Sequence, residues 1–188
     1  SHQGKRHRTS EYTVHKVDKN LEIRLIPSCG YQRHIGFARL IDHSQLAWNL
    51  KKLLKKEKSV PDIAFIGYPP IETAAVMSKW LKARSVPMIL DVKDLWPSMF
   101  IDALPSLLKP LAKITLYPYF YLAKRTIRDA SSISSMAPLF LEWVLNFSNR
   151  IKTENDRVFR LTTPNDQISK EEALSATYWW EAQGVDLS

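Results

Sequence analysis

Apolar and polar residues alternate in two short stretches close to the start of the chain. The first stretch is Tyr12–Val17 and the second is Leu21–Ile26, and Asp18–Asn20 between them are residues typical of a turn. A period of two places successive side chains on opposite faces of a strand. The pattern therefore predicts a β-hairpin with one half-buried face.

Helical and strand patterns then follow one another. Apolar residues recur at helical spacing over Ile35–Lys56 and again over Glu72–Ala83. Continuous apolar runs at Ile63–Gly67 and Val86–Val92 are typical of strands buried on both faces. A strand, a helix and a second strand in this order predict a βαβ unit with a right-handed crossover.

The second half of the chain continues this alternation, after a loop that follows Pro97. The predicted elements are a helical stretch at Ser106–Arg128 that Pro110 or Pro118 can break, a strand at Ser131–Ser135, a helix at Met136–Asn146, a strand at Val158–Thr162 and a helix from Ser169 to about Gln183. Alternating strands and helices predict an α/β fold with a mainly parallel sheet and helices on both faces. The strands at 63–67, 88–92 and 131–134 are expected to be parallel neighbours.

The composition fits a single globular domain. Of the 188 residues, 45% are hydrophobic and 24% are charged, which excludes a disordered or collagen-like chain. Cys29 is the single cysteine, so it forms no internal disulfide and no thiolate zinc site, and a reducing compartment such as the cytosol is the default. The sequence has no signal peptide and no apolar run of about 18 residues. Its polar start, Ser1–Gly4, lacks a Met and indicates a truncated, processed or trimmed chain.

The net charge is strongly positive. Lys and Arg total 27 against 19 Asp and Glu, which gives +8 and a pI of about 9.6. Such a chain is attracted to nucleic acid, to an anionic membrane or to phosphorylated substrates, and charge alone does not choose among them. Neither glycine-rich phosphate-binding motif, G-x-G-x-x-G or G-x-x-x-x-G-K-[ST], occurs in the sequence.

Three loops follow predicted strands, and open α/β sheets bind ligands at the carboxyl ends of their strands. These loops are Gly67–Pro70, Asp91–Pro97 and Ser134–Met136. The middle loop holds two carboxylates, a lysine and a tryptophan. One carboxylate could orient or deprotonate an acceptor hydroxyl while Lys93 holds an anion. The alternative is that Asp94 caps the next turn and Trp96 fills the core.

Several motifs along the chain match a known pattern. They are Pro61-Asp62 before an apolar strand, Pro69-Pro70 followed by Glu72, Asp91-Val92-Lys93-Asp94-Leu95-Trp96-Pro97, and Asn155–Phe159 before Ser169. Together they resemble the N-terminal domain of family 4 glycosyltransferases, which are retaining GT-B enzymes, and most of all the bacterial capsule and O-antigen enzymes. Tyr31, Arg39 and His43 stand where members often carry these residue types. The resemblance covers nearly the whole chain, and its most specific motif is the one that ends at Pro97.

The resemblance implies one half of a GT-B fold, a Rossmann-like domain that binds the acceptor and faces a second domain that binds a nucleotide sugar. It implies an incomplete acceptor domain at residues 1–163, and a linker and helix at residues 164–188 that lead to an absent donor domain. The full enzyme would transfer a sugar from a nucleotide sugar to a glycan or lipid-linked acceptor in surface polysaccharide biosynthesis. The resemblance implies no metal and no other cofactor, and the chain alone is expected to be inactive.

Site residues carry over from the family only at matching positions. Asp94 stands where the family's acidic residue faces the cleft, and we expect it to orient the acceptor or to assist as a base. Lys93, His2, Tyr68 and Trp96 are expected to bind the acceptor. Lys93 could instead pair with the aspartate that ends the strand, which is itself expected to be structural, and His2 could be a solvated terminal residue.

The stretch Leu107–Arg125 mixes lysines and leucines with a cluster of Tyr and Phe residues. Such a stretch can lie in a membrane interface with its aromatic rings at the headgroups, and a buried helix with exposed lysines is the alternative. We expect a cytoplasmic protein, peripheral on the inner face of the cell membrane, with an anionic membrane surface as a further partner. No RNA-recognition pattern occurs, so nucleic acid is not expected. A sugar-nucleotide 2-epimerase of GT-B-like fold and a non-catalytic module that binds a membrane or a polyanion are the alternative functions.

Overall fold

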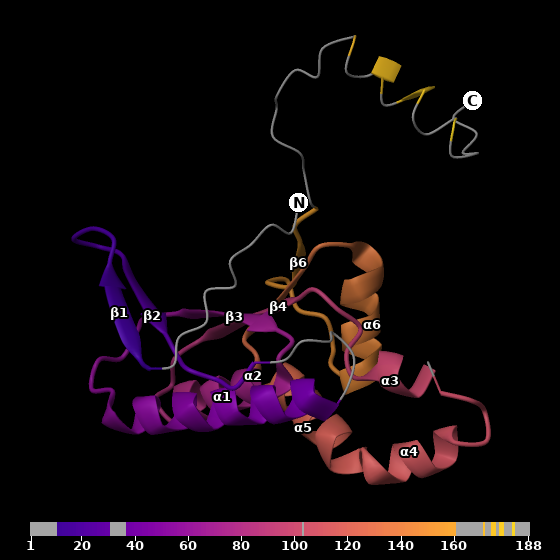
Figure 1. The fold of residues 1–188 in the computed structure, drawn as a ribbon, viewed down its shortest axis with the longest axis horizontal. Helices are drawn as coiled ribbons and strands as arrows, with labels where there is room; N and C mark the ends of the chain where they lie inside the picture. The colour runs from indigo at the N-terminus through magenta and orange to yellow at the C-terminus, as the bar shows by residue number, and fades with distance from the viewer. Residues whose placement is uncertain are drawn as a thin grey trace.

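The computed structural model describes residues 11–30, 37–102 and 104–160, together with residues 171, 174, 175, 177, 178 and 182. In these ranges the chain forms a two-stranded sheet and a four-stranded sheet with helices beside it (Figure 1). The expected α/β class is therefore confirmed: a Rossmann-like parallel sheet flanked by helices, with a hairpin near the start of the chain.

The hairpin consists of β1 (Thr13–Lys16) and β2 (Glu22–Leu25), which pair antiparallel. The Asp18 carboxylate holds its turn, because Oδ1 accepts hydrogen bonds from the backbone N–H of Asn20 at 2.6 Å and of Leu21 at 3.0 Å. Aspartate is favoured in turns since its short side chain reaches the backbone a few residues on. The predicted hairpin is confirmed.

The four-stranded sheet is parallel throughout. In spatial order its strands are β3 (Ala64–Tyr68), β4 (Met88–Val92), β5 (Ser132–Ser135) and β6 (Arg157–Val158). Each neighbouring pair runs parallel, so the three strands predicted as parallel neighbours are confirmed. The strand predicted at Val158–Thr162 starts one residue after β6 does, and residues 161 and 162 lie outside the described ranges.

The helices follow the predicted alternation with the strands, with two differences. In the described ranges they are α1 (Phe37–Lys56), α2 (Ile71–Lys82), α3 (Ser98–Asp102), α4 (Lys109–Thr115), α5 (Tyr117–Asp129) and α6 (Pro138–Ser148). First, α3 occupies part of a predicted loop. Second, the helical stretch predicted at Ser106–Arg128 is two helices, and Pro110 and Pro118 each lie in the first turn of one. Proline suits a first turn but interrupts a helix already under way.

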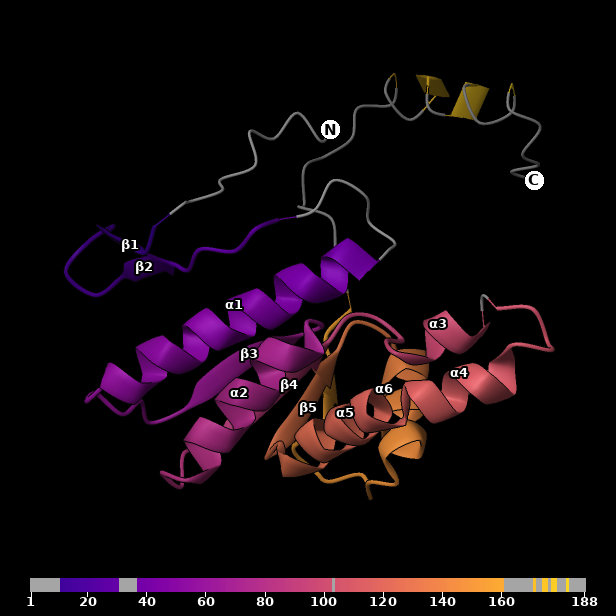
Figure 2. The same cartoon turned by 60° about the horizontal axis from the view of Figure 1, so that its bottom comes forward.

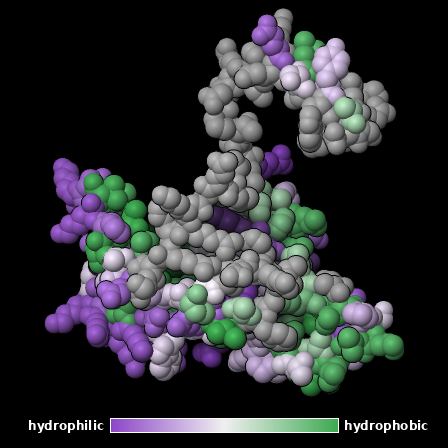
Figure 3. Space-filling model, in the orientation of Figure 1, coloured by the Kyte–Doolittle hydropathy of each residue, from purple (hydrophilic) through white to green (hydrophobic). Residues whose placement is uncertain are grey.

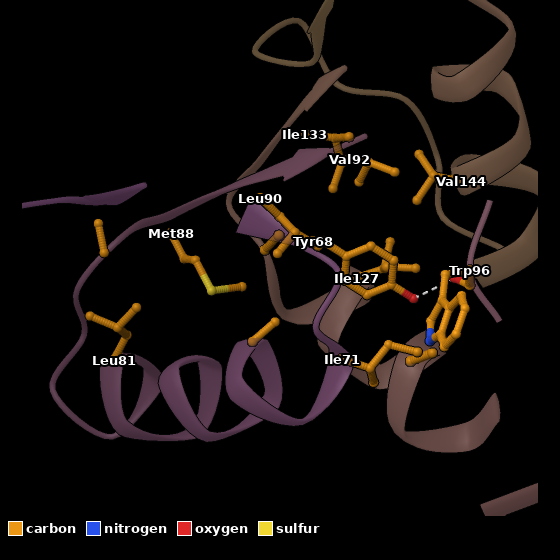
Figure 4. Packing of buried hydrophobic residues seen from close by; sticks show 14 of the residues in the cluster. Tyr68, Ile71, Leu81, Met88, Leu90, Val92, Trp96, Ile127, Ile133 and Val144 are labelled. Carbon is orange, nitrogen blue, oxygen red and sulfur yellow. Dashed lines mark hydrogen bonds between the residues drawn. The ribbon is translucent and has the colours of Figure 1, made fainter. Parts of the chain in front are cut away.

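The core lies between the helices and one face of the sheet. Tyr68, Leu90 and Ile133 share this face by strand register, and each is at most 1% exposed. They pack with buried residues of α2, α5 and α6, such as Ile127 and Val144 (Figure 4). Figure 2 shows α2 and α5 in front of the strands.

The opposite face of the sheet is exposed at β3. Phe65, which points to this side, is 62% exposed, and Ile63 just before β3 is 56% exposed. Buried residues of α2, α5 and α6 belong to the cluster on the face that carries Tyr68, Leu90 and Ile133.

Two expectations about the end of the chain stay predictions. The boundary between residues 163 and 164 lies outside the described residues. Most of the helix expected from Ser169 to Gln183 lies outside them as well, including Ser169 itself.

Candidate functional site

The three loops selected from the sequence meet at one edge of the sheet. Tyr68, Val92 and Ser135 are neighbours at the carboxyl ends of β3, β4 and β5. The backbone N–H of Lys93 donates to the Tyr68 carbonyl at 3.1 Å, so the chain after β4 stays beside β3. This is the edge at which parallel sheets place ligands.

Asp91 is a buried carboxylate with two partners. Its Oδ1 accepts a hydrogen bond from Ser134 Oγ at 2.9 Å, and its Oδ2 lies 3.0 Å from Lys93 Nζ. These contacts offset the cost of removing a carboxylate from water. They agree with the expected structural role of Asp91 and with the expected pairing of Lys93 with the strand-end aspartate. The Lys93 side chain is 65% exposed, so its ammonium can also reach a ligand.

Asp94 differs from Asp91 in its surroundings. It is partly exposed, and among the described residues its carboxylate takes part in no hydrogen bond or ion pair. The alternative in which Asp94 caps the next turn therefore has no hydrogen bond to support it in the described chain. Open space lies nearby on the sheet, because a Cβ built on Gly67, which pairs with Asp91, would meet no atom within 4 Å.

Tyr68 and Trp96 lie inward from these two charged residues. Tyr68 is 1% exposed and Trp96 is 6% exposed, and the Tyr68 hydroxyl donates to the Trp96 carbonyl at 2.8 Å (Figure 4). Burial is the main cause that raises the pKa of the Tyr68 hydroxyl well above its usual value, and the charge of Asp94 contributes in the same direction. The bond fixes the loop that carries Lys93 and Asp94 against the end of β3.

The Trp96 indole begins a chain of polar contacts that crosses three helices. Its Nε1–H donates to the Tyr119 hydroxyl at 2.9 Å, and this hydroxyl donates to Glu72 Oε1 at 3.2 Å. Glu72 Oε2 lies 3.6 Å from His43 Nδ1, and the Arg39 guanidinium lies over the Trp96 ring, 4.6 Å from its centroid. Burial raises the pKa of Tyr119, so its hydroxyl stays protonated and can donate. The network ties α1, α2 and α5 to the loop after β4.

The structure brings four of the five expected site residues to one edge of the sheet. Lys93 and Asp94 reach solvent there, while Tyr68 and Trp96 support them from the core. His2 lies outside the described residues. The acceptor-binding roles of all these residues stay predictions.

Sequence reasoning assigned no role to two residues of this network. Glu72 had a signal, because it follows the Pro69-Pro70 motif. For Tyr119 the sequence shows no sign of a role beyond its place in an aromatic cluster. Only the folded chain brings its hydroxyl within 2.9 Å of the indole nitrogen of Trp96, which is 23 residues earlier.

A groove of about 770 Å³ lies between α1, α2 and α5. Apolar side chains line it together with the rings of Trp48 and Trp80, and Lys51, Lys55, Lys79 and Arg84 are also among its lining residues. Among all the described residues, no group of three or more His, Cys, Asp or Glu side chains is arranged to hold a metal ion.

Comparisons with known proteins add no assignment. No protein-family model matches the chain, and a search of curated proteins finds no significant match.

Proposed function

We propose that this chain is the acceptor-side part of a glycosyltransferase of the GT-B type. The enzyme would transfer a sugar from a nucleotide sugar, bound by a second domain, to a glycan or lipid-linked acceptor of surface polysaccharide biosynthesis. One observation carries the proposal: Asp94 is a partly exposed carboxylate without a bonding partner among the described residues, at the carboxyl edge of a parallel sheet. The resemblance of the motif Asp91–Pro97 to family 4 enzymes supplies the type of reaction.

Asp94 acts on the acceptor hydroxyl in the proposed reaction. In the transfer, an acceptor hydroxyl bonds to the anomeric carbon of the sugar as the bond from that carbon to the nucleotide diphosphate breaks. Asp94 accepts a hydrogen bond from this hydroxyl, orients it and assists the loss of its proton. The exposed ammonium of Lys93 meets an anionic group of the acceptor, such as a phosphate.

The buried residues of the network give these two side chains a fixed position. The bond from Tyr68 to the Trp96 carbonyl and the bond from the Trp96 indole to Tyr119 both hold Trp96, which follows Lys93 and Asp94 in the loop. A loop held in this way lowers the conformational entropy that is lost when the acceptor binds.

The location that fits this function is the cytoplasm, with the protein peripheral on the inner face of the cell membrane. An acceptor linked to a lipid keeps its reacting hydroxyl near the bilayer, so the acceptor-binding edge has to come close to it. The single cysteine, Cys29, agrees with a reducing compartment.

The substitution Asp94→Asn tests the proposal in the complete enzyme. It keeps the size of the side chain and removes its charge, so it should lower sugar transfer to the acceptor by about a hundredfold or more. Donor binding and the melting temperature should stay the same. The measurement is the initial rate of transfer of radiolabelled sugar from nucleotide sugars to lipid-linked acceptors.

Asp62→Asn is the matched control. Asp62 is an exposed aspartate that precedes β3, so it lies at the opposite edge of the sheet. Its substitution should leave transfer unchanged. Transfer by Asp94→Asn within about twofold of the wild type would remove Asp94 from the site and leave the proposal without its main support.

A further inference from the structure

The surface of α4 and the start of α5 carries a row of exposed apolar side chains. Leu107 is 93% exposed, Leu111 61% and Ile114 73%. The row continues into α5 with Tyr117 at 66% and Tyr121 at 53%. Leu111 and Ile114 are three residues apart in α4, and Tyr117 and Tyr121 are four apart in α5, so each pair lies on one face of its helix. Figure 3 shows hydrophobic side chains gathered at this end of the molecule.

The same segment carries positive charge without negative charge. Residues 104–128 contain five cations and no Asp or Glu. These cations are Lys109, Lys113, Lys124, Arg125 and Arg128. The first acidic residue after them, Asp129, is already paired with Lys82 and lies 3.8 Å from Arg125. The apolar row is therefore flanked by cations whose charge is not neutralised within the segment.

We propose that α4 and the start of α5 are the surface by which this protein docks on an anionic bilayer. Apolar side chains bordered by lysines, with tyrosines at one end, are the composition of a helix that lies in the plane of a membrane interface. In the described part of the chain no helix is long and apolar enough to cross a bilayer. Docking in the interface, rather than insertion across it, is therefore the mode that this surface fits.

The charge argues against a second copy of this chain as the occupant of the apolar row. A symmetric contact with a second copy would bring Lys109 and Lys113 close to the same lysines of its partner, and like charges would oppose it. Anionic headgroups instead provide negative charge over a wide plane, which attracts lysines such as Lys109 and Lys113.

The neighbouring helices add to this attraction. Lys51, Lys55, Lys79 and Arg84 line the groove between α1, α2 and α5. The helix layer that holds this groove continues through α5 to α4, because α5 contributes Leu122 to the groove and packs against α4. The helix layer thus presents positive charge beyond the apolar row. The inference does not depend on glycosyl transfer, because it rests on exposure and charge alone.

Cosedimentation with vesicles tests the inference. The chain should bind vesicles of equal parts phosphatidylcholine and phosphatidylglycerol, and bind phosphatidylcholine vesicles at least about tenfold less. Raising the salt from about 0.1 M to about 0.5 M should weaken the binding, because it shortens the reach of the charges.

Two double variants test the apolar row and the lysines that border it. Leu111→Asp with Ile114→Asp should weaken binding to the anionic vesicles by at least about tenfold, since it puts charge in the row that enters the interface. Lys109→Ala with Lys113→Ala should weaken it by a similar factor on anionic vesicles only. All four side chains are exposed or half-buried, so both variants should melt like the wild type.

Ile151→Asp with Lys152→Ala is the control. Ile151 is 88% exposed beside an exposed lysine, in the loop after α6. This control should bind like the wild type, and so should Asp94→Asn, which separates docking from catalysis. Three results would overturn the inference: no binding to anionic vesicles, an equal loss in the control, or a dimer in solution that Leu111→Asp with Ile114→Asp dissociates.

Discussion

Two aspartates that are close together in the sequence differ in how deeply they are buried. Asp91 and Asp94 are three positions apart, yet Asp91 is 7% exposed and bonded to Ser134 and Lys93, while Asp94 reaches solvent. A parallel strand produces this difference, because its last residues are paired on both sides and the next residues leave the sheet. The chemistry proposed here therefore belongs to the second aspartate.

Tyr68 offers a test at the scale of one residue. Its hydroxyl donates to the Trp96 carbonyl at 2.8 Å in a site that is closed to water. Tyr68→Phe removes the donor and leaves a buried carbonyl without it, which should cost about 1–2 kcal/mol of the free energy of unfolding. Urea titration followed by Trp fluorescence measures this loss.

The exposed Tyr121 provides the comparison for that experiment. Tyr121 is 53% exposed, and Tyr121→Phe should leave the free energy of unfolding unchanged. If Tyr68→Phe instead keeps the stability and raises the KM for the acceptor, the hydroxyl contacts the acceptor directly.

The sequence predicted where four candidate residues lie better than how deeply each one is buried. The position of Asp94, Lys93, Tyr68 and Trp96 at one edge follows from strand order, since carboxyl ends of parallel strands share an edge. Their burial does not follow from the local sequence. The contact of Trp96 with Tyr119 needs the packing of α5, which no local pattern contains.

At the scale of elements, the spacing of apolar residues predicted where helices lie, but it left open where one helix ends and the next begins. Over Ser106–Arg128 the apolar spacing suits one helix, and the structure has two, because Pro118 starts α5 afresh. The hydrophobic pattern of α3 spans 5 residues, which is too short for a helical period to stand out. Long patterns such as that of α1 predicted the element well.

The junction between α5, β5 and β6 depends on one buried ion pair. The Asp156 side chain is fully buried, and it accepts hydrogen bonds from the backbone of Ile133 at 2.7 Å and Thr153 at 2.8 Å. The Arg150 guanidinium, whose side chain is 9% exposed, lies 3.1 Å from the same carboxylate. One carboxylate thus satisfies donors from three parts of the chain.

Asp156→Ala should therefore destabilise the protein strongly. It leaves the Arg150 charge and two backbone donors buried without their acceptor, and losses of about 3–5 kcal/mol are typical of such a site. Thermal melting of the variant measures this loss. Glu154→Ala, at an exposed position two residues away, should melt like the wild type, and an equal loss in both variants would show that the loop rather than the ion pair matters.

At the scale of the whole molecule, the two proposed functions use different parts of the fold. The proposed site of glycosyl transfer lies at the carboxyl edge of the strands, and the proposed docking surface lies on α4, which packs against α3 and α5, and on the start of α5 (Figure 2). The core between them is one continuous cluster. A rigid core of this kind would hold the proposed acceptor-binding edge at a fixed place relative to the proposed docking surface.

The hairpin has few contacts with the rest of the fold, so the molecule should unfold in parts. Both of its strands are mainly exposed, and Arg24 joins it to α1 through an ion pair with Glu57 just after that helix. Isolated two-stranded hairpins are marginally stable, so backbone N–H groups of β1 and β2 should exchange with solvent at least about a hundredfold faster than those of β4. Hydrogen exchange read by NMR measures both rates in one sample.

Arg24→Ala should speed exchange in the hairpin further and leave β4 unchanged, because β4 is protected by the core and not by this ion pair. Equal protection of the hairpin and β4 would show instead that the hairpin opens only when the whole sheet unfolds.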